Sequence, residues 1–144
     1  MTEIKWDNSL SIGIKLIDTQ HIMLISKLYD ISVAVAENPM IKGVNSIIKT
    51  LDFLIDYTDF HFSTEEKHMK EQGYPDIDYH VEQHGEFKET LKNLLDDFDE
   101  EGATVDLAES VNQFLFNWFI KHITNVDMKF GKFLQEKGLA DIKE

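Results

Sequence analysis

Residues 51–65 read Leu-Asp-Phe-Leu-Ile-Asp-Tyr-Thr-Asp-Phe-His-Phe-Ser-Thr-Glu. Leu51, Leu54 and Thr58 recur at the three- and four-residue spacing of one helix face, and the same stripe continues into His61 and Glu65. The pattern therefore predicts a helix whose core-facing side changes from apolar to ionisable residues part-way along its length.

Three further segments carry apolar residues at helical spacing, so the chain predicts four long helices. Breaks are expected at Pro39, Pro75 and Gly102, which stand beside other turn residues, and Asp18 is expected to cap the first helix. The predicted helices span approximately residues 18–38, 41–72, 77–99 and 104–135. Short turns between them favour an all-α fold, an up-down-up-down four-helix bundle with an N-terminal arm at residues 1–17.

The composition narrows the class of protein. With 144 residues, 42% of them hydrophobic, the chain is sized for a single domain covering residues 1–144. Its 27 acidic and 14 basic residues give a formal charge of -13, which would repel nucleic acid and anionic membrane surfaces. Cysteine is absent, which excludes thiolate metal sites and disulfides. No stretch resembles a membrane span or a leader, so a cytoplasmic location is expected.

Most of the histidines stand where the helical period expects core residues. Five of the six, together with one glutamate, occupy such positions: His21, His61, His80, His84, His122 and Glu65. A carboxylate in a core is strongly disfavoured unless it is paired or binds a metal. One histidine on an apolar face is more often a hydrogen-bonded core residue than a ligand. Here all four predicted helices place such residues in the core, and this combination favours a metal site instead.

Spacing brings two pairs onto shared helix faces, because residues four apart lie on the same side of a helix. These pairs are His61 with Glu65, and His80 with His84. Asp127 fits less well, since it follows His122 by five residues and an ideal helix would turn it about 140° away. Either Asp127 reaches around obliquely, or a local π-type turn lies between the two residues.

The number of donors predicts two metal ions, because five imidazoles and two carboxylates exceed what one ion normally takes. Such donors suit iron, manganese, zinc or copper. If two six-coordinate ions share both carboxylates and one oxide or hydroxide, five histidines leave a single position open. That position falls on the ion with two histidines, where one small ligand could bind.

The same residues resemble the hemerythrin family, in particular its single-domain bacterial members, over nearly the whole chain. The matching stretches are Ile12-Gly-Ile, Ile17-Asp-Thr-Gln-His21, Phe60-His-Phe-Ser-Thr-Glu65-Glu66, Gly73-Tyr-Pro, His80-x-x-x-His84 and Trp118-Phe-Ile-Lys-His122-Ile-Thr-Asn-Val-Asp127. The resemblance implies a non-heme centre of two iron ions, bridged by an oxo or hydroxo group. It assigns His80, His84 and His122 to the saturated iron, His21 and His61 to the iron that takes oxygen, and Glu65 and Asp127 to the bridges.

The resemblance also implies a dry pocket over the open position. Its expected lining is Leu24, Phe62, Trp118, Phe119 and Ile123. Family members commonly carry Leu or Ile where this chain has Phe119, so the bulkier ring is expected to narrow the pocket. Outside this set, His68 is expected to be solvated because its Glu-x-x-His motif has no second copy, and Glu66 to be the exposed neighbour of a ligand.

The function implied by the resemblance is reversible binding of dioxygen for storage, transport or delivery, by a protein expected to be a monomer. Two alternatives stay open. One is a di-iron enzyme acting on O2, peroxide or nitric oxide, and the other is an oxygen sensor working through a partner protein. A donor set rich in histidine and poor in carboxylate argues against an oxidase, by analogy with di-iron oxygenases.

Overall fold

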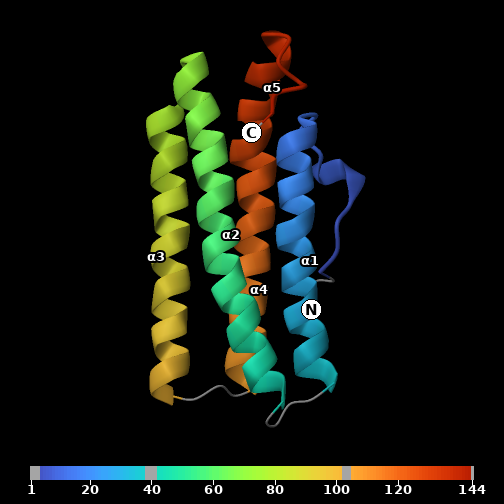
Figure 1. Ribbon diagram of the computed structural model, residues 1–144, viewed down its shortest axis with the longest axis vertical. Helices are drawn as coiled ribbons and strands as arrows, with labels where there is room; N and C mark the ends of the chain where they lie inside the picture. Colours follow the sequence, from blue (N-terminus) through green and yellow to red (C-terminus); the bar gives the residue numbers. More distant parts are fainter. Residues whose placement is uncertain (1–3, 38–41, 102–104, 144) are drawn as a thin grey trace.

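Four long helices make up the computed structural model, which describes residues 4–37, 42–101 and 105–143. They are α1 (Lys15–Glu37), α2 (Lys42–Gln72), α3 (Ile77–Glu101) and α4 (Val105–His122). The last helix continues through the π-helix η2 (Ile123–Asp127) into α5 (Met128–Glu136). Successive helices run in opposite directions (Figure 1), so the predicted up-down-up-down four-helix bundle is confirmed.

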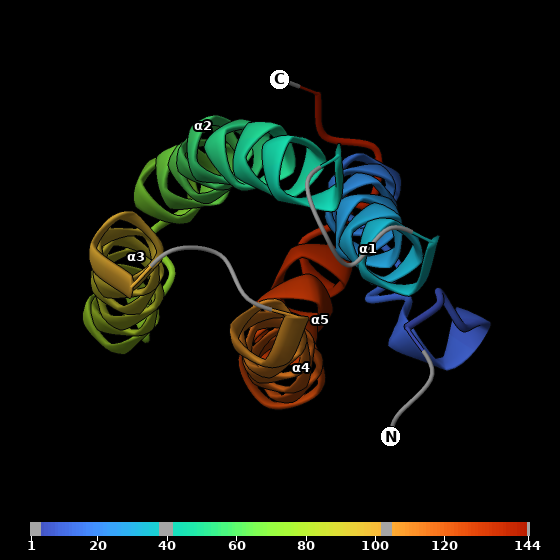
Figure 2. The same cartoon turned by 90° about the horizontal axis from the view of Figure 1, so that it is seen from below.

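The helices form a ring when the bundle is seen from its end (Figure 2). Contacts join α1 to α2, α2 to α3, α3 to α4 and α4 back to α1. The interior is filled by aliphatic and aromatic side chains such as Leu28, Ile31, Leu51, Leu91 and Leu115, all 3% exposed or less. Within the described ranges, no helix is both long and apolar enough to cross a membrane.

The N-terminal arm is shorter than predicted, because α1 begins at Lys15 instead of residue 18. Asp18 is not the cap of α1. Its own N–H donates to the Ile14 carbonyl at 2.9 Å, which places it inside the first turn. The Asp18 carboxylate instead accepts hydrogen bonds from the Ser11 hydroxyl (2.5 Å) and the Ile12 N–H (2.9 Å). It therefore ties the arm to the helix, a long-range role that the capping pattern could not reveal.

The arm is packed rather than loose. It contains a short 3-10 turn, η1 (Asn8–Leu10), whose start is capped by the Asp7 carboxylate accepting from the Ser9 N–H at 2.8 Å. Gly131 of α5 leaves the space that the arm needs, because a Cβ added there would lie 2.5 Å from the Ile12 carbonyl oxygen. The arm thus covers the last helix through direct backbone contact.

The C-terminal segment folds back after α5. Gly138, at φ 73°, allows the Leu139 N–H to return to the Leu134 carbonyl at 2.9 Å, a common way to end a helix. Leu139 and Ile142 then pack against the core. The breaks predicted at Pro39 and Gly102 lie outside the described residues, and so do three of the predicted helix boundaries, at residues 38, 41 and 104.

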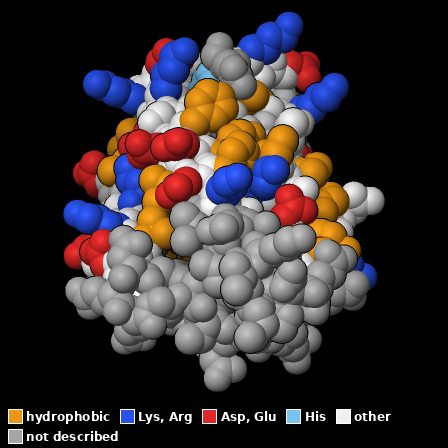
Figure 3. Space-filling view, turned by 60° about the horizontal axis from the view of Figure 1, so that its bottom comes forward, with side chains coloured by type: hydrophobic (Ala, Val, Ile, Leu, Met, Phe, Trp, Pro, Cys, Tyr) orange, Lys and Arg blue, Asp and Glu red, His pale blue; other side chains and the backbone are white. Residues whose placement is uncertain are grey.

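The surface mixes charge and apolar area. On the face shown in Figure 3, hydrophobic side chains gather in the middle of the described region, with Lys, Asp and Glu side chains around them. The acidic residues outnumber the basic ones 27 to 14 over the whole chain. The net charge therefore opposes binding to polyanions.

Candidate metal centre

All seven predicted ligands lie inside the bundle. They come from every long helix and from the π-helix: His21 (α1), His61 and Glu65 (α2), His80 and His84 (α3), His122 (α4) and Asp127 (η2). None is more than 2% exposed. The helical period that carries Leu28 and Leu51 into the core carries these ionisable side chains there too.

Their donor atoms form two overlapping groups. One consists of Glu65, His80, His84, His122 and Asp127, and the other of His21, His61, Glu65 and Asp127. Within each group the candidate donor atoms all lie within 4.8 Å of one another. Both carboxylates belong to both groups, whereas three histidines belong to one group and two to the other. The arrangement could hold two cations side by side.

The two carboxylates lie between the histidine sets. Asp127 Oδ2 is 3.0 Å from His21 Nε2, and Asp127 Oδ1 is 2.9 Å from His80 Nε2 and 3.1 Å from His122 Nε2. Glu65 Oε1 is 3.2 Å from His61 Nε2 and 3.4 Å from His84 Nε2. Each carboxylate thus faces imidazoles of both groups, as a ligand shared by two ions would.

These buried polar atoms are not satisfied by the protein itself. Both oxygens of Glu65 and of Asp127 lack a hydrogen bond of acceptable geometry, and so does the Nε2 atom of each of the five histidines. Unsatisfied buried polar groups are rare because each one costs free energy. A convergent set of such atoms, all of nitrogen and carboxylate type, fits two cations that prefer these donors.

The protonation states also suit a cation. Burial raises the pKa of Asp127, but the neighbouring His122, His21 and His80 outweigh it and hold that pKa well below its ordinary value. Burial and the Asp127 charge raise the pKa of Glu65, and His61 and His84 outweigh them and lower it. Both carboxylates are therefore ionised at neutral pH.

Two histidines, one from each set, differ in this respect. Burial lowers the pKa of His61 despite the nearby Glu65 carboxylate, which leaves its imidazole neutral. For His84 the burial effect is outweighed by Glu65 and Glu66, and its pKa rises to about 9. A cation binding through His84 would have to displace a proton.

A π-turn between His122 and Met128 brings Asp127 to the same side of the helix as His122. This is one of the two alternatives that the sequence left open. In η2 the N–H of Met128 donates to the carbonyl of Ile123, five residues earlier. The wider turn brings Asp127 Oδ1 to 3.1 Å from His122 Nε2, although five residues separate them. Such π-bulges are frequent at functional sites.

Two outer hydrogen bonds orient ligand imidazoles, and sequence reasoning missed both. Gln20 Oε1 accepts from His61 Nδ1 at 2.6 Å, and Glu66 Oε2 accepts from His84 Nδ1 at 2.8 Å. Glu66, predicted to be only an exposed neighbour, is in fact 30% exposed and holds His84. Such bonds fix the tautomer that presents Nε2 to a metal. Each partner directly adjoins a predicted ligand in sequence, which is the signal that could have found them.

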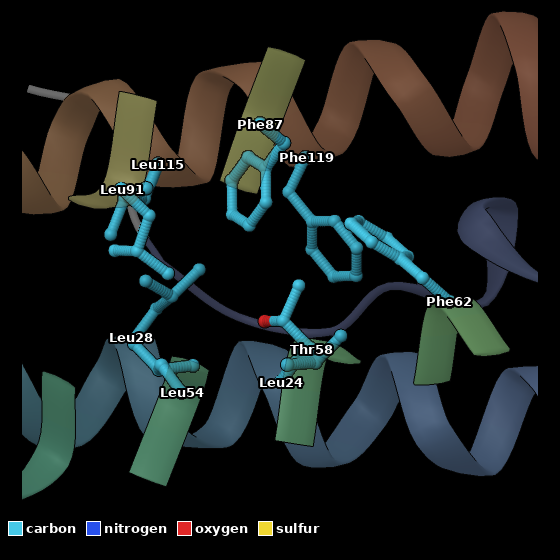
Figure 4. A pocket seen from close by; sticks show the side chains of 9 residues that line it. All are labelled: Leu24, Leu28, Leu54, Thr58, Phe62, Phe87, Leu91, Leu115 and Phe119. Atoms are coloured by element: carbon cyan, nitrogen blue, oxygen red, sulfur yellow. The ribbon is translucent and has the colours of Figure 1, made fainter. Parts of the chain in front are cut away.

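A small apolar cavity lies next to the site (Figure 4). Of the predicted pocket residues, Leu24, Phe62 and Phe119 line it; Trp118 and Ile123 do not. Trp118 lies about 100° around α4 from Phe119 and stacks on the His122 ring at 4.6 Å instead. Ile123 is fully buried at the start of the π-turn.

Two further lining residues, Thr58 and Phe87, are level with Leu24 and Phe119. The rest of the lining lies further from the site and consists of Leu28, Leu54, Leu91 and Leu115. The cavity is small, with space of about 10 Å³, which is near the lower limit for one water molecule.

His68 corrects another prediction, since it is buried (6% exposed) rather than solvated. Its Nδ1 atom lies 4.0 Å from a Glu71 carboxylate oxygen, and it belongs to neither donor group. The end of α2 is covered partly by the C-terminal segment, where Lys137 Nζ donates to the Gln72 carbonyl at 2.9 Å.

Known proteins show the same sequence pattern and fold. The chain is 30% identical to a bacteriohemerythrin of Stenotrophomonas maltophilia over 91% of its own length and 81% of the relative's. It is 28% identical to a myohemerythrin of Theromyzon tessulatum, covering 88% and 89% of the two chains. The crystal structure of a wild-type hemerythrin superposes with a TM-score of 0.77 at 25% identity, covering 91% of this chain and 97% of that one. The family model described as the hemerythrin HHE cation binding domain matches residues 12–134, and the chain accordingly belongs to the hemerythrin family.

Proposed function

We propose that the chain binds dioxygen reversibly at a non-heme centre of two iron ions, and that it stores, carries or delivers oxygen rather than consuming it. When bound, the two ions would supply the redox chemistry that dioxygen binding needs. The observation that carries the proposal is the uneven sharing of donors. Three histidines stand on one side, two stand on the other, and both carboxylates lie between them.

The seven predicted ligands would be shared between the two iron ions. His80, His84 and His122 would hold one iron, His21 and His61 the other, and Glu65 and Asp127 would bridge them. Gln20 and Glu66 would keep two of these imidazoles in position through their Nδ1 atoms. Five histidines shared by two six-coordinate ions leave the two-histidine side with room for one further ligand.

The surroundings of that side favour binding without onward chemistry. The Phe119 ring meets the His21 ring edge-on at 5.2 Å, and both Phe119 and Leu24 line the apolar cavity. Nothing in this lining offers an acid or a base. Apolar walls exclude the water and protons that would convert a bound ligand into products. The absence of a carboxyl, imidazole or amine group among the described lining residues supports a carrier.

The test combines metal analysis with optical cycling. Protein produced with ample iron should contain two iron ions per chain. It should then be reduced without air, exposed to air, and freed of oxygen while its visible spectrum is followed. We expect spectral changes that repeat over many cycles without loss. One metal ion per chain, or a preference for zinc or manganese, would contradict the proposed centre. Steady oxygen consumption with a reductant would instead identify an enzyme.

A further inference from the structure

The cavity beside the site has one wall built from a single layer of side chains. Each long helix contributes one residue that lies three positions from one of its site histidines, and these residues are Leu24, Thr58, Phe87 and Phe119. Three positions along a helix correspond to about 4.5 Å. This layer therefore lies about 4.5 Å along the bundle from the site histidines, and three of its four residues are apolar.

Thr58 is the exception in this layer. Among the nine described side chains that line the cavity, it alone carries a polar atom. The side chain is 1% exposed, and its Oγ1 atom makes no hydrogen bond. In Figure 4 this oxygen lies inside the ring of labelled side chains, on the side of Thr58 that faces Leu28 and Leu54.

A threonine inside a helix normally satisfies its hydroxyl on the preceding turn of backbone. Thr64, two turns further along α2, does so by donating to the Phe60 carbonyl at 2.9 Å. Thr58 lies on the same helix and does not. Its hydroxyl is turned away from its own backbone and into the cavity, where the other lining side chains offer no partner.

An unpaired buried hydroxyl destabilises the folded protein, and a valine of the same shape would avoid that cost. The cavity has room for about one water-sized group, so a partner for this hydroxyl must be small. The nearest place where a small ligand could be anchored is the metal centre, one helix layer away. A molecule of two or three atoms can span that separation.

We propose that the Thr58 hydroxyl donates a hydrogen bond to the outer atom of a two- or three-atom ligand held at the metal centre. Thr58 would thereby strengthen the binding of ligands whose outer atom accepts a hydrogen bond and slow their escape into the cavity. This inference rests on the proposed function, because the ligand's other end needs the metal centre as its anchor.

The test uses azide, a three-atom anion whose outer nitrogen accepts hydrogen bonds. Its affinity and dissociation rate are measured by absorption on the oxidised iron-loaded protein, after iron is counted in each sample. Thr58→Val removes the hydroxyl and keeps the shape, while Thr58→Ser keeps the hydroxyl. Thr64→Val is the matched control, because it removes a buried hydroxyl from the same helix outside the cavity.

We expect Thr58→Val to bind azide about tenfold more weakly, mainly through faster dissociation, as the loss of one hydrogen bond predicts. Thr58→Ser should restore most of the affinity, and Thr64→Val should leave it unchanged. Thermal melting of the chelated proteins gives a second readout that needs no iron. There Thr58→Val should melt no lower than the parent, whereas Thr64→Val should melt lower.

Equal azide affinity in the parent and Thr58→Val would overturn the inference while leaving the proposed function intact. A weakened Thr58→Val that serine does not rescue would also overturn it, since packing would then explain the loss. The same holds if the iron-loaded parent forms no azide complex. A parent that holds no iron would refute the proposed function itself, and the inference with it.

Discussion

Phe119 is the residue most directly placed to control entry to the site. Its ring is 3% exposed, lines the cavity and lies 5.2 Å from the His21 ring. Phe119→Leu would widen the cavity, so we expect stopped-flow association of oxygen and of azide to become several-fold faster. The lost packing should cost about 1–2 kcal/mol of stability.

Phe116→Leu is the matched control, because Phe116 is equally buried on the same helix but does not line the cavity. It should lose similar stability and leave the association rates as they were. Association rates that are the same in Phe119→Leu and the parent would show that the ring does not limit entry.

Some residues of the candidate site could be predicted from the sequence, and others could not. The five histidines and Glu65 could be predicted as a group because the helical period alone assigns them to the interior, and the structure does gather them there. Trp118 does not line the cavity because it points about 100° away from its neighbour Phe119 on α4. His68, Gln20 and Glu66 depended on which other segment covers them. That is tertiary information, and one sequence does not contain it.

At the scale of elements, the π-helix η2 is what allows Asp127 to join the site. Thr124 is the second residue of this turn, and its hydroxyl donates to the Ile120 carbonyl, on the preceding turn, at 2.9 Å. Lys121 O is also within reach at 3.3 Å. Thr124 therefore supports the turn from the solvent side, away from the donor atoms.

We expect Thr124→Val to loosen this turn. Because the residue is exposed and water can replace part of the bond, the loss of stability should be only about 0.5–1 kcal/mol. Asp127, the proposed iron ligand, should nevertheless be held less firmly, so a chelator should remove iron faster than from the parent. Thr124→Ser retains the hydroxyl and should keep iron as the parent does. Equal rates of iron loss in Thr124→Val and the parent would contradict a supporting role.

The helices themselves were easier to predict than their ends. Apolar periodicity located four segments, and α3 begins at Ile77 as expected. The start of α1 was misjudged because Asp18 bonds to Ser11 and Ile12 across a bend, a contact that a local capping pattern does not describe. A π-turn could be suspected from the five-residue spacing, but choosing it over an oblique reach required the backbone itself.

At the scale of the whole molecule, the donor set is a cross-link between all four helices. Removing the metal would leave two ionised carboxylates near each other among unsatisfied imidazoles, in the middle of the bundle. Metal binding to such a site adds directly to folding stability. The chelated protein should therefore melt well below the iron-loaded protein at every pH tested.

The chelated protein should also show a specific dependence on pH. The pKa of His84 is about 9 in the folded chain against an ordinary 6.5, so the folded state holds this proton more tightly than the unfolded state. The resulting stabilisation is present in full below pH 6.5 and is lost as the pH rises through 9. It amounts to on the order of 2–3 kcal/mol. Glu65 behaves oppositely, because its pKa is lowered from 4.5: its contribution is complete above pH 4.5 and is lost as the solution becomes more acidic.

The His84 shift predicts that the melting temperature of the chelated protein falls as the pH rises from 6.5 toward 9. The lowered pKa values of Glu65 and His61 reduce stability only below about pH 4.5 and pH 6.5, so they do not oppose this fall. Iron replaces the His84 proton, so the iron-loaded protein should not show this fall. Glu66→Gln should reduce it in the chelated protein, because Glu66 is one of the two carboxylates that raise the His84 pKa. Melting curves followed by circular dichroism from pH 5 to 9 would measure all three. If the chelated protein kept a constant melting temperature across that range, His84 would not carry the extra proton, and iron binding would release none from it.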